Sequence, residues 1–114
     1  MAWEGLSSAA MRVAPLGPKL HMFVCANRRA ANDPLGSGCG DAGDAMFDAL
    51  KGEVARRGIY RAAWVTRTHC LGLCPKSGCT VAIYPKGRIV IEAEASDAAA
   101  LFQSALDEVA TGTT

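Results

Sequence analysis

Four cysteines are the residues of this chain whose type and spacing are best suited to chemistry. Thirteen residues separate the first two and three residues separate the last two, which gives the set Cys25, Cys39, Cys70 and Cys74. Cys25 ends an apolar segment, and Cys70 also comes soon after one, so we expect both pairs at strand ends, where loops can converge on one site. Four thiolates suffice to hold a metal centre.

The spacing of these cysteines limits which classes of metal centre they could form. Structural zinc sites commonly use short ligand pairs on both sides, whereas here only the second pair is close, so zinc is not favoured. The cysteine runs of bacterial 4Fe-4S ferredoxins and of plant-type 2Fe-2S ferredoxins do not occur in the chain. A Rieske centre would need two histidine ligands, but His21 lies within an apolar segment and only His69 adjoins a cysteine.

Two other uses of the cysteines stay open. A thiol-disulfide or peroxide-handling enzyme of thioredoxin type would place a C-x-x-C motif near the first strand-to-helix junction, where this chain has only Cys25. A structural zinc-binding module would be colourless and without redox chemistry. We leave the fifth cysteine, Cys79, out of the ligand set, because a free cysteine is as often a small buried residue.

Composition excludes several classes of function. The 114 residues suit one domain, and twelve Lys plus Arg nearly balance eleven Asp plus Glu, so nothing indicates binding to nucleic acid or to an anionic membrane. No segment resembles a secretory signal, and no run approaches the roughly 20 apolar residues of a membrane span. We therefore expect a cytoplasmic protein, in which the reducing conditions favour metal ligands or redox thiols over disulfides.

The hydrophobic pattern predicts one α/β domain over residues 20–110, preceded by a loosely ordered extension over residues 1–19 and followed by a tail over 111–114. Strands are expected at about 20–25, 60–66, 80–84 and 88–93, and a first helix at about 44–57. A terminal helix follows, with Ser96 as its N-cap and an apolar stripe from Ala98 to Val109.

This order, β-α-β-β-β-α, implies a particular architecture. A helical crossover after the first strand implies a parallel strand pair, and the turn Pro85-Lys86-Gly87 implies an antiparallel hairpin between the last two strands. The result is a mixed four-stranded sheet covered by two helices, which is consistent with a thioredoxin-like arrangement.

Four stretches, taken together and in order, look like the thioredoxin-like 2Fe-2S ferredoxins. They are HMFVCANRR at 21–29, GSGCG at 36–40, CLGLC at 70–74 and VAIYPKG at 81–87. The resemblance covers nearly the whole domain, and its specificity comes from the ordered combination. The chain departs from the family pattern in two places: the stretch before Cys39 is one residue longer, and Cys79 stands where the family typically has proline.

The resemblance implies a thioredoxin-like fold in which two loops enclose one 2Fe-2S cluster per chain, with ligands Cys25, Cys39, Cys70 and Cys74. It further implies a one-electron carrier, not an enzyme, that serves redox partner proteins and usually forms a homodimer. Such a cluster needs four thiolates and no more, which leaves one cysteine over. Because the cluster is anionic, we expect Arg28, Arg29 or Lys76 to favour its reduced state or to guide a partner.

Overall fold

The computed structural model describes residue 14 and residues 17–28, 38–69 and 77–110. The elements are β1 (Leu20–Cys25), α1 (Gly40–Arg57), β2 (Ala63–Thr68), β3 (Cys79–Tyr84), β4 (Arg88–Ala93), the short 3-10 helix η2 (Ala95–Asp97) and α2 (Ala98–Ala110). The predicted order of strands and helices is confirmed. Most of the expected N-terminal extension and the expected tail over 111–114 lie outside the described residues.

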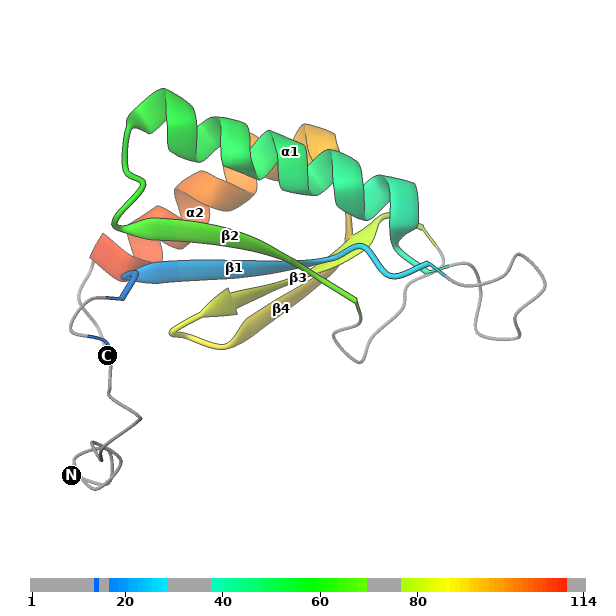
Figure 1. Ribbon diagram of the computed structural model, residues 1–114, viewed down its shortest axis with the longest axis horizontal. Coiled ribbons are helices and arrows are strands. Elements are labelled where there is room, and N and C mark those ends of the chain that lie inside the picture. Colours follow the sequence, from blue (N-terminus) through cyan, green and yellow to red (C-terminus); the bar gives the residue numbers. More distant parts are fainter. Residues whose placement is uncertain (1–13, 15–16, 29–37, 70–76, 111–114) are drawn as a thin grey trace, which may run out of the picture.

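The four strands form one mixed sheet in the order β2-β1-β3-β4 (Figure 1). β1 and β2 are parallel, with Cys25 opposite Thr68, whereas β3 is antiparallel to both of its neighbours. The carboxyl ends of β1 and β2 therefore share one end of the sheet with the start of β3. This topology brings Cys25, His69 and Cys79 to the same end of the molecule, although they are far apart in the sequence.

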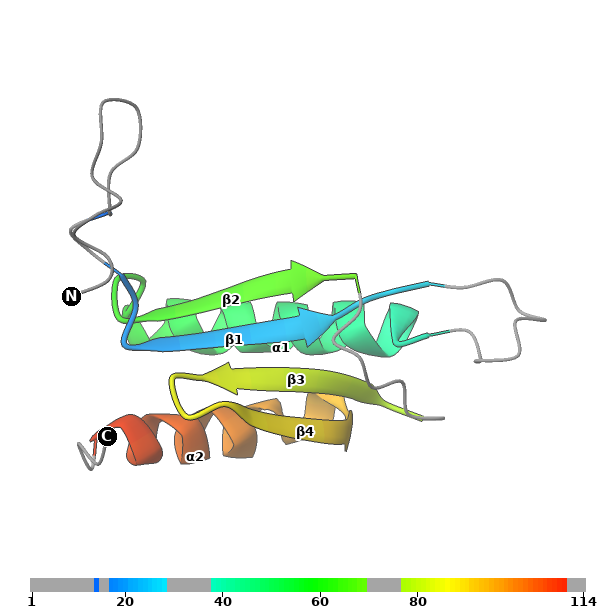
Figure 2. The same ribbon diagram turned by 90° about the horizontal axis from the view of Figure 1, so that it is seen from below.

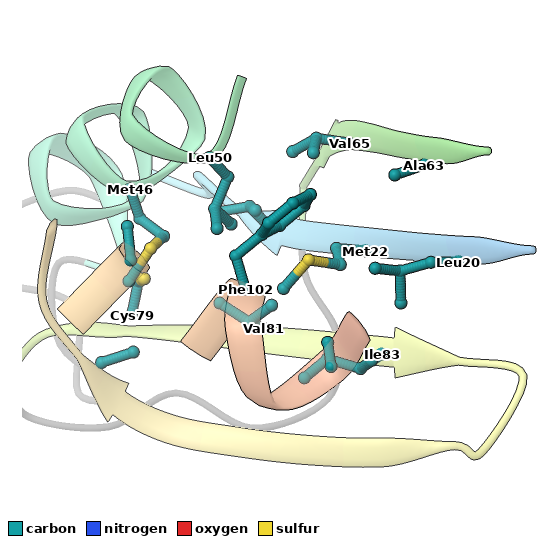
Figure 3. Packing of buried hydrophobic residues seen from close by; sticks show 14 of the residues in the cluster. Leu20, Met22, Met46, Leu50, Ala63, Val65, Cys79, Val81, Ile83 and Phe102 are labelled. Atoms are coloured by element: carbon teal, nitrogen blue, oxygen red, sulfur yellow. The ribbon is translucent and has the colours of Figure 1, made fainter. Parts of the chain in front are cut away.

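Both helices pack on the same face of the sheet, as the two views in Figures 1 and 2 show. The core lies between the two layers. Alternate residues of β1 are buried there, as the period of a strand requires, and Phe102 of α2 lies among them with no exposed surface (Figure 3). None of the described helices is long and apolar enough to cross a membrane.

Four boundaries differ from those predicted, one of them the end of β2, which lies at Thr68 and not at residue 66. α1 begins at Gly40, four residues before the predicted start. Its first turn contains two glycines, and because glycine has a low helix propensity the sequence gives no helical signal there. β2 begins at Ala63, since the chain just before it forms a turn in which Ala62 and Ala63 donate backbone hydrogen bonds to the Ile59 carbonyl. β3 begins one residue early, at Cys79.

The predicted N-cap at Ser96 is wrong. The chain enters a 3-10 turn first, and Glu94 is its N-cap, in extended conformation. The Asp97 carboxylate accepts a hydrogen bond of 2.9 Å from the Glu94 backbone N–H, and the Glu94 side chain accepts one in return. This reciprocal capping box satisfies the backbone N–H groups of Glu94 and Asp97, and α2 follows directly from the 3-10 turn at Ala98.

The sheet face opposite the helices carries a row of aromatic rings. The His21 ring stacks on Phe23 with centroids 4.0 Å apart and meets Trp64 edge-on at 5.6 Å, while Phe23 meets Tyr84 edge-on. His21 Nε2 lies 2.8 Å from the Thr66 hydroxyl. Burial lowers the pKa of His21 from its usual value, which favours the neutral form of the ring.

Gly43 joins the helical layer to the end of β1. A Cβ built at this position would lie 2.0 Å from the Cys25 carbonyl oxygen and 2.9 Å from the Ala26 Cα, both backbone atoms that cannot move aside cheaply. Only glycine therefore lets the first turns of α1 approach the backbone at Cys25 this closely. The position of α1 relative to Cys25 depends on this contact.

We expect Gly43→Ala to destabilise the fold by about 2 kcal/mol, because the added methyl group forces α1 away from β1. Gly52→Ala is the matched control in the same helix, since nothing lies within 4 Å of the added Cβ. The control should gain about 0.5–1 kcal/mol from helix propensity. Denaturant unfolding measures both changes, and equal effects of the two substitutions would contradict the packing argument.

Candidate metal centre

Two of the four predicted ligands lie together at the end of the sheet. Cys25 is the last residue of β1 and Cys39 immediately precedes α1, and both side chains are buried. The structure therefore brings together two cysteines that have thirteen residues between them in the sequence. The other two predicted ligands, Cys70 and Cys74, lie outside the described residues, and their role stays a prediction.

The two thiols lie close to each other and to the segment after β2. The Cys25 thiol donates to the carbonyl oxygen of His69, with a sulfur-to-oxygen distance of 3.1 Å. Cys25 and Thr80 lie near enough to Cys39 to affect the pKa of its thiol. Since His69 directly precedes Cys70, the backbone that leads into the second cysteine pair starts beside Cys25.

The surroundings favour the protonated form of the thiol. Burial, and next the hydrogen bond with Cys25, raise the pKa of Cys39 to about 11, although the hydrogen bonds from Thr80 oppose the rise. Two adjacent thiolates in so buried a place need a compensating cation. Ferric or zinc ions would supply that charge and displace the protons, as metals bound by cysteine do.

The donor set fits a metal centre that takes further ligands from elsewhere in the chain. Among residues 17–28, 38–69 and 77–110, no three His, Cys, Asp or Glu side chains are arranged to hold a metal ion by themselves. Cys25 and Cys39 supply one pair of soft sulfur donors, which suits iron-sulfur clusters or zinc. A complete set of four thiolates then requires a second pair, which the sequence offers only at Cys70 and Cys74 if Cys79 stays in the core.

Cys79 lies in the core of the protein. It has no exposed surface, and it belongs to the same buried cluster as Met46 of α1 (Figure 3). Burial, followed by the negative charge of a Cys39 or Cys25 thiolate nearby, raises the pKa of Cys79 to about 12. These observations support the interpretation of Cys79 as a small packed residue.

The loop geometry before α1 places Cys39. Gly38 has φ +87°, and a Cβ there would lie 2.1 Å from the Asn27 carbonyl oxygen, so the position requires glycine. The Gly40 N–H donates a 3.0 Å hydrogen bond to the same Asn27 carbonyl. The chain that leaves β1 and the chain that enters α1 are thus tied together on either side of Cys39. Gly38 lies within the stretch in which this chain is one residue longer than the family pattern.

Charged side chains beside this end of the sheet are paired. Arg28 binds Asp41 at 2.9 Å and also binds Asp44, which raises the pKa of Arg28. Arg67 binds Asp44 at 3.1 Å, and its guanidinium lies over the Phe47 ring. The Arg28 charge is therefore compensated by carboxylates of α1, which weakens the expectation that it acts as a free cation. Arg29 and Lys76 lie outside the described residues.

Comparison with known proteins shows where this architecture occurs. The chain matches no family model and no curated protein at a significant level. A crystal structure of the thioredoxin-like 2Fe-2S ferredoxin from Aquifex aeolicus matches with a TM-score of 0.67 and 23% identity, over 76% of this chain and 84% of that one. A second structure of this ferredoxin matches with a TM-score of 0.69 over 79% and 82% of the two chains.

The chain has a thioredoxin-like fold. The resemblance inferred from the cysteine motifs is thus confirmed at the level of the fold. In this thioredoxin-like fold the helical crossover leads from Cys25 through α1 to β2, and Cys39 lies at the start of that helix. Sequence reasoning missed the contact of Thr80 with Cys39 and the pairing of Arg28 with α1, because no sequence spacing signals either one.

We expect Cys79 to resist alkylation in the native protein. With a pKa of about 12, only roughly one thiol in ten thousand is ionised at pH 8, and the sulfur is fully buried. Iodoacetamide should therefore label Cys79 only after denaturation, which mass spectrometry of the Cys79 peptide reports. Rapid stoichiometric labelling under native conditions would contradict the core position, and the denatured sample provides the control for reactivity.

Proposed function

We propose that this protein is a one-electron carrier that binds one 2Fe-2S cluster through Cys25, Cys39, Cys70 and Cys74. One observation carries the proposal: the buried thiols of Cys25 and Cys39 are in mutual contact beside the backbone that leads into Cys70. The fold supports it, because a thioredoxin-like 2Fe-2S ferredoxin shares this architecture. The cluster would supply a couple that accepts and releases single electrons.

The residues around the two cysteines suit an anionic centre. α1 begins at Gly40, directly after Cys39, and the free N–H groups of a helix N-terminus carry partial positive charge. The Cys39 side chain makes no capping hydrogen bond to the helix, and it lies near Cys25. In this arrangement the chain would bind the cluster through cysteine sulfur and shield the sulfur from water. The partial positive charge at the start of α1 would offset the negative charge of the cluster.

The proposed role defines the partners. Electrons would pass to and from other proteins, which would dock at the end of the sheet where Cys25 and Cys39 lie, and the chain itself would turn over no substrate. The ion pairs of Arg28 and Arg67 with Asp44 make the described side of this end mixed in charge. A cytoplasmic location forms part of the proposal, since Cys25, Cys39 and Cys79 are free thiols that reducing conditions preserve.

We expect replacement of a ligand to abolish normal cluster binding. Cys25→Ser and Cys39→Ser should each lose most of the visible absorption, iron and acid-labile sulfide, because serine oxygen is a poor substitute for thiolate at iron. Cys79→Ser makes the same chemical change at a third buried cysteine and should retain the iron and sulfide content of the unaltered protein. Equal loss in all three variants would contradict this ligand set.

We further propose that the protein forms a homodimer through the aromatic face of the sheet. The rings of Phe23, Trp64 and Tyr84 lie on this face, and Ile89 and Ile91 of the neighbouring β4 are about half exposed. These side chains are uncharged, and burial favours the neutral form of His21 by lowering its pKa. Two identical faces of this kind can meet across a two-fold axis without opposing like charges.

The homodimer predicts a mass in solution of twice the 11.9 kDa of one chain. Trp64→Arg should raise the dimer dissociation constant at least tenfold, because it places two desolvated cations in the interface. Ala45→Arg adds the same charge at an exposed position of α1, on the opposite side of the sheet, and should leave the dimer unchanged. Sedimentation velocity measures both. A monomeric unaltered protein, or equal effects of the two substitutions, would contradict the interface.

A further inference from the structure

One carboxylate near the start of α1 binds two arginines from different parts of the chain. Asp44 Oδ2 accepts a hydrogen bond from the guanidinium of Arg28, which lies in the segment that leaves β1. Asp44 Oδ1 accepts a hydrogen bond of 3.1 Å from Arg67, near the end of β2. Each oxygen of the carboxylate therefore binds a different segment, and three segments of the chain are joined at Asp44.

The same three segments carry the proposed ligands of the cluster. Cys25 ends β1, and Cys39 directly precedes α1. The residue after β2, His69, accepts the hydrogen bond of the Cys25 thiol, and Cys70 follows it in the sequence. The carboxylate that joins these segments is thus placed to hold the ends from which the proposed ligands extend.

Further contacts hold both guanidinium groups in place. Arg28 also binds Asp41 at 2.9 Å, and it lies so close to the first turn of α1 that a Cβ at Gly40 would be 2.9 Å from its Nη1. The guanidinium of Arg67 lies over the Phe47 ring, 4.5 Å from the ring centroid. An isolated surface ion pair contributes little, whereas several charges in one network can hold a defined geometry.

We propose that Asp44 is a positioning residue of the metal centre, which joins the segment that leaves β1 to the end of β2 and thereby slows loss of the bound cluster. The inference rests on the proposed function. A cluster bound by thiolates from several segments is lost when those segments separate, so an ion-pair network that joins them slows the loss. Asp44 acts through the segments that carry the ligands and takes no electron itself.

Two substitutions break this network with opposite changes of charge. Asp44→Asn keeps the shape of the side chain but loses a negative charge and both ion pairs, whereas Arg67→Gln loses a positive charge and one ion pair. The decay of the visible absorption of the cluster-loaded protein in excess EDTA measures the rate of cluster loss. We expect this rate to rise about fivefold in Asp44→Asn and about twofold in Arg67→Gln. A simple effect of charge would instead change the rate in opposite directions.

Arg88→Gln is the matched control. It removes an ion pair between β4 and α2, at the end of the sheet opposite to Cys25. Denaturant unfolding should show a similar small loss of global stability in Arg88→Gln and Arg67→Gln, but the rate of cluster loss should be unchanged in the control. In about 1 M salt, which screens exposed charges, the rates of Asp44→Asn and of the unaltered protein should converge.

The outcomes separate this inference from the function on which it rests. Unchanged rates in Asp44→Asn and Arg67→Gln, rates that change in opposite directions, or an equal acceleration in Arg88→Gln would overturn the inference alone. A difference between Asp44→Asn and the unaltered protein that salt does not reduce would do the same, because it would not arise from ion pairs. Absence of iron and sulfide from the unaltered protein would overturn both the inference and the proposed function.

Discussion

The close approach of α1 to the end of β1 is the constraint on which the rest of the structure depends. Gly43 lies against the Cys25 carbonyl, at a distance that no side chain tolerates, and this contact fixes where the helix begins relative to the strand. Cys39 precedes that helix directly, so its sulfur is placed beside Cys25 by backbone packing. A site assembled in this way is held by rigid elements and by few loop interactions.

The topology of the sheet extends this arrangement to residues from distant parts of the chain. Because β1 and β2 are parallel, the segment after β2 starts beside Cys25, and the His69 carbonyl accepts the Cys25 thiol hydrogen. Because β3 runs antiparallel to β1, its first residues return to the same end and bring Thr80 to Cys39. Both helices lie on one face, so the aromatic face remains uncovered by any described element.

Much of the fold could be predicted from the sequence, because its signals are local. The apolar segments at 20–25 and 88–93 and the helical period after Ala98 predicted correct elements, and the first helix ends at Arg57 as predicted. The start of α1 was misplaced because Gly43 is required for a tertiary contact with β1. Rules that consider only the local sequence do not include such a contact. The N-cap error has a similar cause, since the Glu94–Asp97 capping box competes with Ser96.

Two of the predicted site residues, Cys25 and Cys39, lie together in the structure, whereas Cys70 and Cys74 stay predictions. The meeting of Cys25 and Cys39 followed from strand ends and metal chemistry, whereas the position of Thr80 near Cys39 and the ion pairs of Arg28 arise only from tertiary structure. The central claim is that this chemistry is that of a redox-active iron-sulfur cluster. The most direct test is the visible spectrum of freshly purified protein before and after dithionite, with iron, acid-labile sulfide and zinc measured on the same sample. We predict a red-brown protein with about two irons and two sulfides per chain that bleaches reversibly; a colourless protein with stoichiometric zinc would contradict the account.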